Sequence, residues 1–145
     1  MDSLDVNVRA QELVWQFQSE YSAITKGIQM HYLTKELTVF SMPITRNLCA
    51  AGGFVNGFEL GVVANYAGVY LAMMNSRYFT PLRTINEMKY FKPTVLGKDK
   101  EVQAYAKIFS MDERYIIVEV EIKNKDELKA KGYLKYKVLS GEYKV

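Results

Sequence analysis

A short glycine-rich segment, residues 50–59, combines residue types that could bind and activate a carbonyl group. It reads Ala-Ala-Gly-Gly-Phe-Val-Asn-Gly-Phe-Glu and leads into a long apolar run. Glycines let a backbone come close to a ligand. If Asn56 caps a helix that begins here, the free N–H groups and partial positive charge of its first turn could hold a carbonyl oxygen or an oxyanion. This segment is the first candidate for a functional site.

Glu59 is the one formal charge between Arg46 and Arg77. In the first turn of a helix, its carboxylate could simply favour the helix dipole. It could instead orient or activate a water molecule against a carbonyl that the same helix end holds. The residue types leave both interpretations open.

Asn65 interrupts the apolar run six residues after Glu59. Six residues turn a helix by about 600°, so the two side chains do not share a face. An amide in an apolar helix needs a hydrogen-bond partner. That partner could be a core group or a ligand bound across a subunit boundary.

Several other kinds of site are excluded by the cysteine and histidine content. Cys49 is the only cysteine and His31 the only histidine, so an internal disulfide and a His/Cys metal cluster are impossible. The glycine-rich motifs that cradle nucleotide phosphates do not occur. We therefore expect no metal and no required cofactor.

The charge balance argues against nucleic acid as a partner. The formal net charge of the 145 residues is only +3. The charge is uneven, because residues 89–145 carry 13 basic and 9 acidic side chains. The N-terminus is acidic and lacks the apolar core of a signal peptide, so we expect a cytoplasmic protein.

The apolar run predicts the element that positions the candidate site. Residues 60–74 are apolar on nearly every face, so they should form a helix buried on all sides. The run is shorter than the about 20 residues that cross a membrane, so we expect no membrane span. Small residues at four positions would let other backbones approach: Gly61, Ala64, Ala67 and Gly68.

Two elements are predicted before that helix. The apolar spacing from Asp5 to about Ser22 indicates an amphipathic helix, capped by Asp5 and with Trp15 near its seam. It should pack on the body of the domain or on a second subunit. Residues 26–42 indicate a strand or a bent hairpin that Pro43 ends.

Four strands are predicted after the helix, at residues 83–91, 101–110, 115–122 and 128–138. Short turns between alternating segments are typical of an antiparallel meander with one face in water. The lysines of the last strand would form a solvated face or protect an edge. The order predicts an α+β fold, an antiparallel sheet wrapped around one long central buried helix.

At the glycine-rich segment, the chain resembles the hotdog-fold superfamily of acyl-coenzyme A thioesterases, in particular the single-hotdog, PaaI-like enzymes. In that family a loop with a His-Gly-Gly-like motif leads into the central helix, and an acidic residue of the helix acts as base or nucleophile. The matching frame here is Asn56-Gly57-Phe58, preceded by Gly53. Asn65, nine residues after Asn56, stands at the acidic position.

Two later segments carry the same likeness, residues 84–93 followed by Gly97 and residues 128–138. The resemblance covers roughly residues 26–140. It implies a hotdog domain over residues 26–145, with residues 1–25 as an N-terminal helical extension.

The departures from the family pattern concern catalysis. Amides replace both the family histidine, at Asn56, and the family acid, at Asn65. An amide is not a useful general base near neutral pH. Glu59 is then the one substitute in this region. The segment around Asn65 also resembles the effector domain of malonyl-CoA-sensing repressors, which have this fold and bind acyl-CoA without hydrolysing it.

The resemblance implies three alternative functions. The first is a protein that binds acyl-CoA or another acyl thioester with weak or no hydrolysis, as a homodimer or a dimer of dimers. The second is an active acyl-CoA thioesterase or a dehydratase that uses Glu59. The third is a protein-interaction module with an empty groove, whose docking surface would surround Trp15.

The resemblance also implies which residues surround the ligand. The acyl carbonyl would lie near the backbone of Gly57 and Phe58. The full set of expected ligand-binding residues is Gly53, Asn56, Gly57, Phe58, Glu59 and Asn65. Four lysines are candidates for the coenzyme A phosphates: Lys89, Lys92, Lys98 and Lys100.

Overall fold

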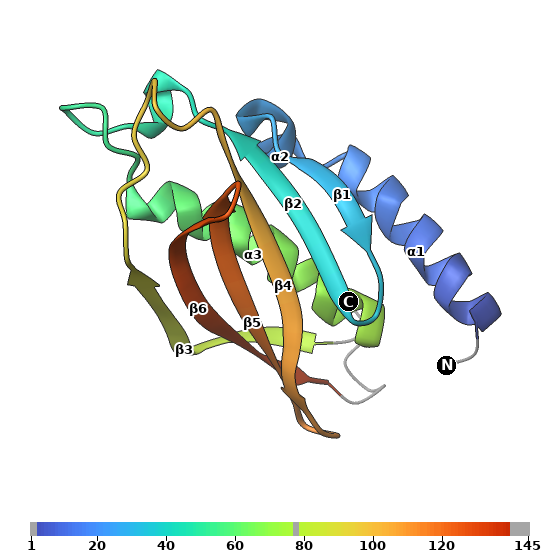
Figure 1. Ribbon diagram of the computed structural model, residues 1–145. Helices are drawn as coiled ribbons and strands as arrows, with labels where there is room; N and C mark the ends of the chain where they lie inside the picture. Colours follow the sequence, from blue (N-terminus) through green and yellow to red (C-terminus); the bar gives the residue numbers. More distant parts are fainter. Residues whose placement is uncertain (1–2, 77–78, 140–145) are drawn as a thin grey trace.

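The structure is a computed structural model that describes residues 3–76 and 79–139, with side chains described over residues 7–76 and 87–139. Six strands form one antiparallel sheet, and the long helix α3 lies behind it in the view of Figure 1. In chain order the elements are α1 (Ser3–Gln18), α2 (Tyr21–Lys26), β1 (Gln29–Leu33), β2 (Leu37–Pro43), a 3₁₀ turn (Arg46–Leu48), α3 (Gly57–Asn75), β3 (Phe79–Tyr90), β4 (Glu101–Met111), β5 (Tyr115–Asn124) and β6 (Glu127–Val138).

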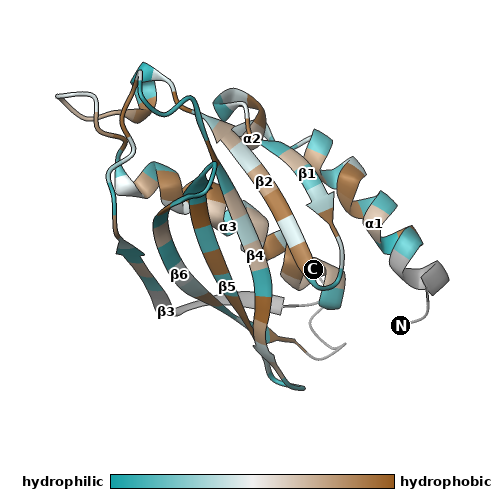
Figure 2. Ribbon diagram, viewed as in Figure 1, coloured by the Kyte–Doolittle hydropathy of each residue, from teal (hydrophilic) through white to brown (hydrophobic). Residues whose placement is uncertain are grey.

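The predicted α+β arrangement of one antiparallel sheet and one long helix is confirmed. The predicted hairpin is present as β1 and β2, and β2 ends at Pro43. In Figure 2 the strands β4 and β5 alternate between apolar and polar residues. On β5, Ile116, Val118 and Val120 are fully buried, while the residues between them are partly exposed. The apolar face of the sheet thus packs on α3, as period-two alternation requires.

The prediction of a simple four-strand meander is wrong. The sheet order is β1-β2-β4-β5-β6-β3, so β3 pairs with β6 at the far edge. After β2 the chain crosses behind the sheet in α3 and enters the opposite edge as β3 (Figure 1). The strand β6 is therefore an interior strand, and its lysines do not protect an edge.

One lysine of β6 also faces the opposite way from the prediction. Lys129 is buried, whereas Lys131 and Lys135 lie on the partly exposed face. The pairing of β5 with β6 shifts register between Ile122 and Lys123. A register shift of one residue reverses which face a side chain points to.

The helix α3 is not buried on all sides. Its inward face is deeply buried, with Val63, Ala67 and Leu71 at the core. On the outward face, however, Phe58 is 77% exposed and Asn65 is exposed as well. Phe17 of α1 packs on Tyr66 and Tyr70, and residues 70–74 of α3 are all buried. The outward side of α3 is therefore open only in the first part of the helix, around Phe58 and Asn65.

The N-terminal segment forms two helices rather than one, because the chain leaves the helix between Gln18 and Tyr21. The helix α1 begins at Ser3, so Asp5 lies inside it rather than at its cap. Trp15 is not at the seam, since 81% of it is exposed. The packed side of α1 is formed by Leu13 and by residues that lie partly buried against the core, Ala10 and Phe17.

No helix within residues 3–76 and 79–139 is both long enough and apolar enough to cross a membrane.

Candidate functional site

The first turn of α3 offers two free hydrogen-bond donors. Asn56 occupies the N-cap position, and its carbonyl accepts the N–H of Glu59 at 3.0 Å. The N–H groups of Gly57 and Phe58 donate to no acceptor among the residues that the structure describes. Such free groups at the start of a long helix, together with the positive end of its dipole, can hold a carbonyl oxygen or an anion.

A cavity of about 390 Å³ lies against this helix start. Gly57 and Leu60 line it from α3, and the chain from Tyr90 to Thr94 lines the other side. The hydroxyl of Tyr90 donates to the carbonyl of Gly57 at 3.1 Å, and burial raises the pKa of the Tyr90 phenol above its ordinary value. Tyr90 therefore ties the end of β3 to the start of α3, and the two together form the walls of the cavity.

Thr94 is an unsatisfied polar residue in the wall of this cavity. It is only 2% exposed, and its Oγ1 has no hydrogen-bond partner within the described part of the chain. A buried hydroxyl without a partner costs free energy, so such groups are uncommon in folded proteins. The Thr94 hydroxyl therefore has an unused hydrogen-bonding capacity at the wall of the cavity.

Asn56 does not cap α3 with its side chain, which corrects the expectation from the sequence. The side chain is exposed and forms no capping hydrogen bond. The loop before it is held by the backbone instead. Gly53 has a φ of +81°, and its carbonyl accepts the N–H of Leu96 at 2.9 Å. A positive φ is adopted readily by glycine, so Gly53 has a conformational role in the loop that precedes the helix.

Glu59 faces α2 rather than the cavity. Its Oε2 lies 2.7 Å from Nζ of Lys26, and its side chain is 16% exposed. Glu59 is therefore neither in bulk solvent nor among the residues that line the cavity beside Gly57. Within one chain, the described structure does not bring the Glu59 carboxylate and the cavity together.

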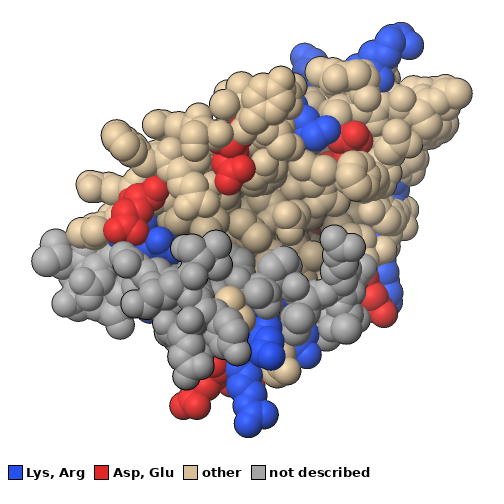
Figure 3. All heavy atoms as spheres, turned by 180° about the vertical axis from the view of Figure 1, so that it is seen from behind, with Lys and Arg blue, Asp and Glu red and all other residues tan. Residues whose placement is uncertain are grey.

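Asn65 lies on the outward face of α3 with Phe58, seven residues or about two turns away. Its amide forms no hydrogen bond inside the core, so the first of its two proposed partners is not found in the described chain. Seen from behind the sheet in Figure 3, the face over α3 consists mostly of uncharged atoms. Asn65 is therefore exposed on the surface of the single chain rather than buried in the interior.

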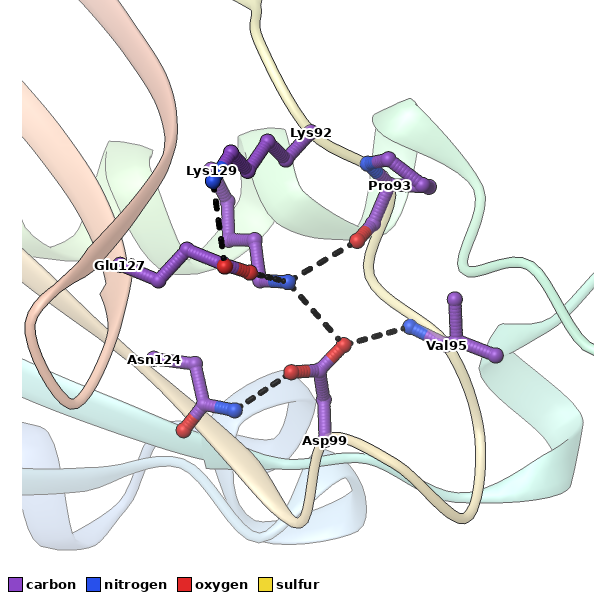
Figure 4. A network of polar contacts seen from close by, with 7 residues as sticks. All are labelled: Lys92, Pro93, Val95, Asp99, Asn124, Glu127 and Lys129. Carbon is purple, nitrogen blue, oxygen red and sulfur yellow. Dashed lines mark hydrogen bonds and ion pairs between the residues drawn. The ribbon is translucent and has the colours of Figure 1, made fainter.

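A buried polar network supports the wall of the cavity (Figure 4). Lys129, whose side chain is 1% exposed, lies 3.3 Å from the Asp99 carboxylate and donates to the Pro93 carbonyl at 3.0 Å. Lys129 also pairs with Glu127. Asp99 in turn accepts the N–H of Val95 at 2.7 Å. Loop residues 93–99 are thereby fixed to the ends of β5 and β6.

The same network lowers the pKa of Asp99. Burial by itself would raise this pKa, but hydrogen bonds from the Val95 N–H, Asn124 and Lys129 outweigh it, and the pKa lies below its ordinary value. The pKa of Lys129 is shifted upwards, because Glu127 and Asp99 outweigh the effect of its burial. Both groups are therefore charged at neutral pH, and their charges compensate each other.

Sequence reasoning missed Lys26, Tyr90 and Thr94. All three contact the candidate region from elements that are far away along the chain. No periodicity or motif connects Lys26 with Glu59, or Tyr90 with Gly57. Among the side chains that the structure describes, no group of three or more His, Cys, Asp or Glu residues could hold a metal ion.

Comparison with known proteins shows a shared fold. No protein-family model matches the chain, and no curated protein matches it by sequence. Among solved structures, the PaaI protein from the phenylacetic acid degradation operon of Escherichia coli is similar with a TM-score of 0.80 at 16% identity, over 92% of this chain and 94% of that one. A thioesterase family protein from Silicibacter pomeroyi has a TM-score of 0.78 at 16% identity, over 92% and 99% of the two chains.

A mutant of the phenylacetic acid degradation protein PaaI from Thermus thermophilus is similar as well. Its TM-score is 0.74 at 20% identity, over 81% of this chain and 97% of that one. The chain therefore has the hotdog fold that the resemblance implied. Its overall architecture is similar to that of the two PaaI proteins and of the thioesterase family protein.

Proposed function

We propose that the protein binds acyl-CoA or another acyl thioester at the N-terminus of α3. The observation that carries the proposal is the pair of free N–H groups of Gly57 and Phe58 at the start of α3, where Gly57 lines a cavity of about 390 Å³. These donors would hold the thioester carbonyl oxygen. The unpartnered hydroxyl of Thr94 would serve a second polar group of the ligand. The hotdog fold shared with thioesterase-family proteins supports this choice of ligand.

Binding without efficient hydrolysis agrees best with the side chains at the site. The cavity lining contains no carboxylate among the described residues. Oε2 of Glu59 is engaged by Lys26, and amides stand at Asn56 and Asn65, where the family has its histidine and its acidic residue. A general base must be within hydrogen-bond reach of the water that it activates. We therefore propose a binding or sensing role for the single-chain site, with thioester hydrolysis as the alternative.

We also propose that the working form is a homodimer in which the outward face of α3 is covered. Phe58 and Asn65 are exposed on this face, and β3 forms a free edge of the sheet. A large exposed aromatic residue on a mostly uncharged face is typical of an interaction surface. In such a dimer Asn65 would approach the partner's ligand, which is the second of its two proposed partners. A cytoplasmic location remains part of the proposal.

Calorimetric titration with acyl-CoAs of several chain lengths, combined with an assay of thiol release, tests this function. We expect saturable binding, little thiol release, and unchanged binding in Glu59→Gln. Lys26→Gln is the matched control, because it frees the Glu59 carboxylate and keeps its charge. Rapid thiol release that disappears in Glu59→Gln but persists in Lys26→Gln would identify the protein as a hydrolase. Complete absence of acyl-CoA binding would favour the protein-interaction alternative.

A further inference from the structure

A second cavity, of about 500 Å³, lies at the end of the sheet where β4 begins and β5 turns into β6. It is separate from the cavity beside α3, since the two share no lining residue. Three lysines line it: Lys98, Lys100 and Lys125. Its acidic lining residue, Glu101, accepts a hydrogen bond from Gln103 at 2.6 Å. The side chains of the lining therefore carry a net positive charge.

The three ammonium groups are available to a ligand. None of them forms an ion pair or a hydrogen bond with any side chain or carbonyl that the structure describes. Other lysines of the same region are neutralised, because Lys92 pairs with Glu127 and Lys129 with Asp99 and Glu127. Three unpaired cations around one hollow repel one another, and an anion between them would remove that repulsion.

Lys125, in the lining of this cavity, has a backbone conformation that is unfavourable for a residue with a side chain. Lys125 has a φ of +56°, and it is the one non-glycine residue with a positive φ in the described chain. Lys125 is the first of the two residues that join β5 to β6. In a two-residue hairpin turn where only the first residue has a positive φ, that residue is normally glycine. Unfavourable backbone conformations of non-glycine residues tend to occur at functional sites. A lysine is thus present at a position where the backbone conformation would favour glycine.

The lining also contains one uncharged side chain that is hydrogen-bonded to a buried residue. Asn124 lines the cavity and donates its amide to Oδ1 of Asp99 at 2.5 Å (Figure 4). Asp99 is 3% exposed and is neutralised by Lys129. Its carboxylate therefore does not cancel the positive charge of the three lysines. The amide of Asn124 is held in place and can contribute a hydrogen bond from its remaining N–H.

We propose that this cavity binds a phosphate or diphosphate group of a small molecule. Three compact ammonium groups with several free N–H donors suit the oxygens of a multiply charged phosphoryl anion better than a singly charged carboxylate. A volume of about 500 Å³ leaves room for more than the phosphoryl group itself. The proposal does not require the acyl-thioester function. The nucleotide part of coenzyme A is one source of such a group, and free diphosphate is another.

Titration of the whole protein with inorganic diphosphate, followed by calorimetry or by NMR shifts at low ionic strength, tests the proposal directly. We expect saturable binding that weakens as salt rises. Lys98→Gln and Lys100→Gln should each weaken it about fivefold, and Lys107→Gln, which removes an exposed lysine from the strand β4, should leave it unchanged. Glu101→Gln should strengthen binding, because it removes the negative charge from the lining.

Lys125→Gly distinguishes loss of binding from loss of stability. Glycine suits the positive φ, so this variant should melt at a higher temperature than the wild type and yet bind diphosphate more weakly. No diphosphate binding by the folded wild type, or equal loss in the Lys107→Gln control, would overturn the proposal. Retained binding when all three lining lysines are replaced by Gln would overturn it as well.

A second titration identifies the source of the phosphate. If coenzyme A is the source, the three lysine variants should bind it more weakly and bind pantetheine, which lacks the nucleotide, as the wild type does. If diphosphate binds and the variants leave coenzyme A affinity unchanged, the phosphate comes from another small molecule. If the protein binds diphosphate but does not bind acyl-CoA, the proposed function is refuted and the proposed phosphate site is still supported.

Discussion

The ammonium group of Lys26 lies 2.7 Å from Oε2 of Glu59, and this ion pair joins the end of α2 to the first turn of α3. Both side chains are mostly buried, at 23% and 16% exposure. The pair therefore explains why a single carboxylate stands in an otherwise apolar helix. It serves as a link between two helices and also favours the positive end of α3.

Removal of Lys26 should lower stability without disrupting the fold. Lys26→Gln is expected to reduce the free energy of unfolding by about 1 kcal/mol, because the pair is only partly shielded from solvent. Urea unfolding followed by circular dichroism measures this change. The double variant with Glu59→Gln should lose little more than the single one, since both remove the same interaction. Strictly additive losses would show that the two groups do not interact.

Thr94→Val should separate ligand binding from stability. Valine has nearly the shape of threonine and removes the unpartnered hydroxyl, so thermal stability should stay the same or rise slightly. If the hydroxyl contacts the ligand, acyl-CoA affinity should fall about tenfold, as expected for loss of one buried hydrogen bond of about 1.4 kcal/mol. Calorimetry and a thermal melt of the same sample give both values. A destabilised variant with normal affinity would exclude this role.

Phe58→Asp should prevent the proposed association of two chains. The side chain is 77% exposed on the outward face of α3, so the single chain loses little when it is changed. A charge buried in an apolar interface is costly, and the dimer should dissociate. Light scattering after gel filtration measures the mass in solution. Phe109→Asp, at an exposed aromatic residue on β4, is the control that should leave the mass unchanged.

Lys129→Met should be strongly destabilising. The substitution leaves the Asp99 carboxylate buried without its cation, which typically costs about 3–5 kcal/mol. The double variant Lys129→Met with Asp99→Asn should recover part of this loss, because no uncompensated charge remains. Chemical denaturation of the wild type, the single variant and the double variant measures the free energy of unfolding of each. Equal stability of the wild type and the single variant would show that the network in Figure 4 adds nothing.

The fold should lose stability in acid because of Asp99. Its pKa in the folded protein lies below the ordinary value, so the unfolded chain binds the proton more readily. The stabilisation is therefore fully present above the unfolded pKa of about 3.9 and is lost as pH falls through the lower, folded value. Urea unfolding from pH 7 to pH 3 should show the onset of this loss below about pH 4. In Asp99→Asn the free energy of unfolding should depend less on pH. An unchanged pH dependence in this variant would show that other groups cause the loss of stability in acid.

The local elements of this fold could be predicted from the sequence. Alternation in residues 101–110 and 115–122 reports only which side chains face the core, and that information is contained in neighbouring residues. The long apolar run from residue 60 to 74 predicted the central helix for the same reason. The glycines before it indicate a segment that leads into that helix, and the structure has Gly53 there at positive φ.

The tertiary structure decided which elements lie together, because strand order and register depend on contacts between distant residues. The position of β3 beside β6, the inward direction of Lys129 and the ion pair of Lys26 with Glu59 each join segments that no local pattern connects. The cavity beside Gly57 has the same origin, since its walls come from α3 and from the chain after β3. The sequence by itself determined an apolar helix with a polar, glycine-rich start. Only the packing of that helix decided that its start at Gly57 borders a cavity and that its carboxylate faces another helix.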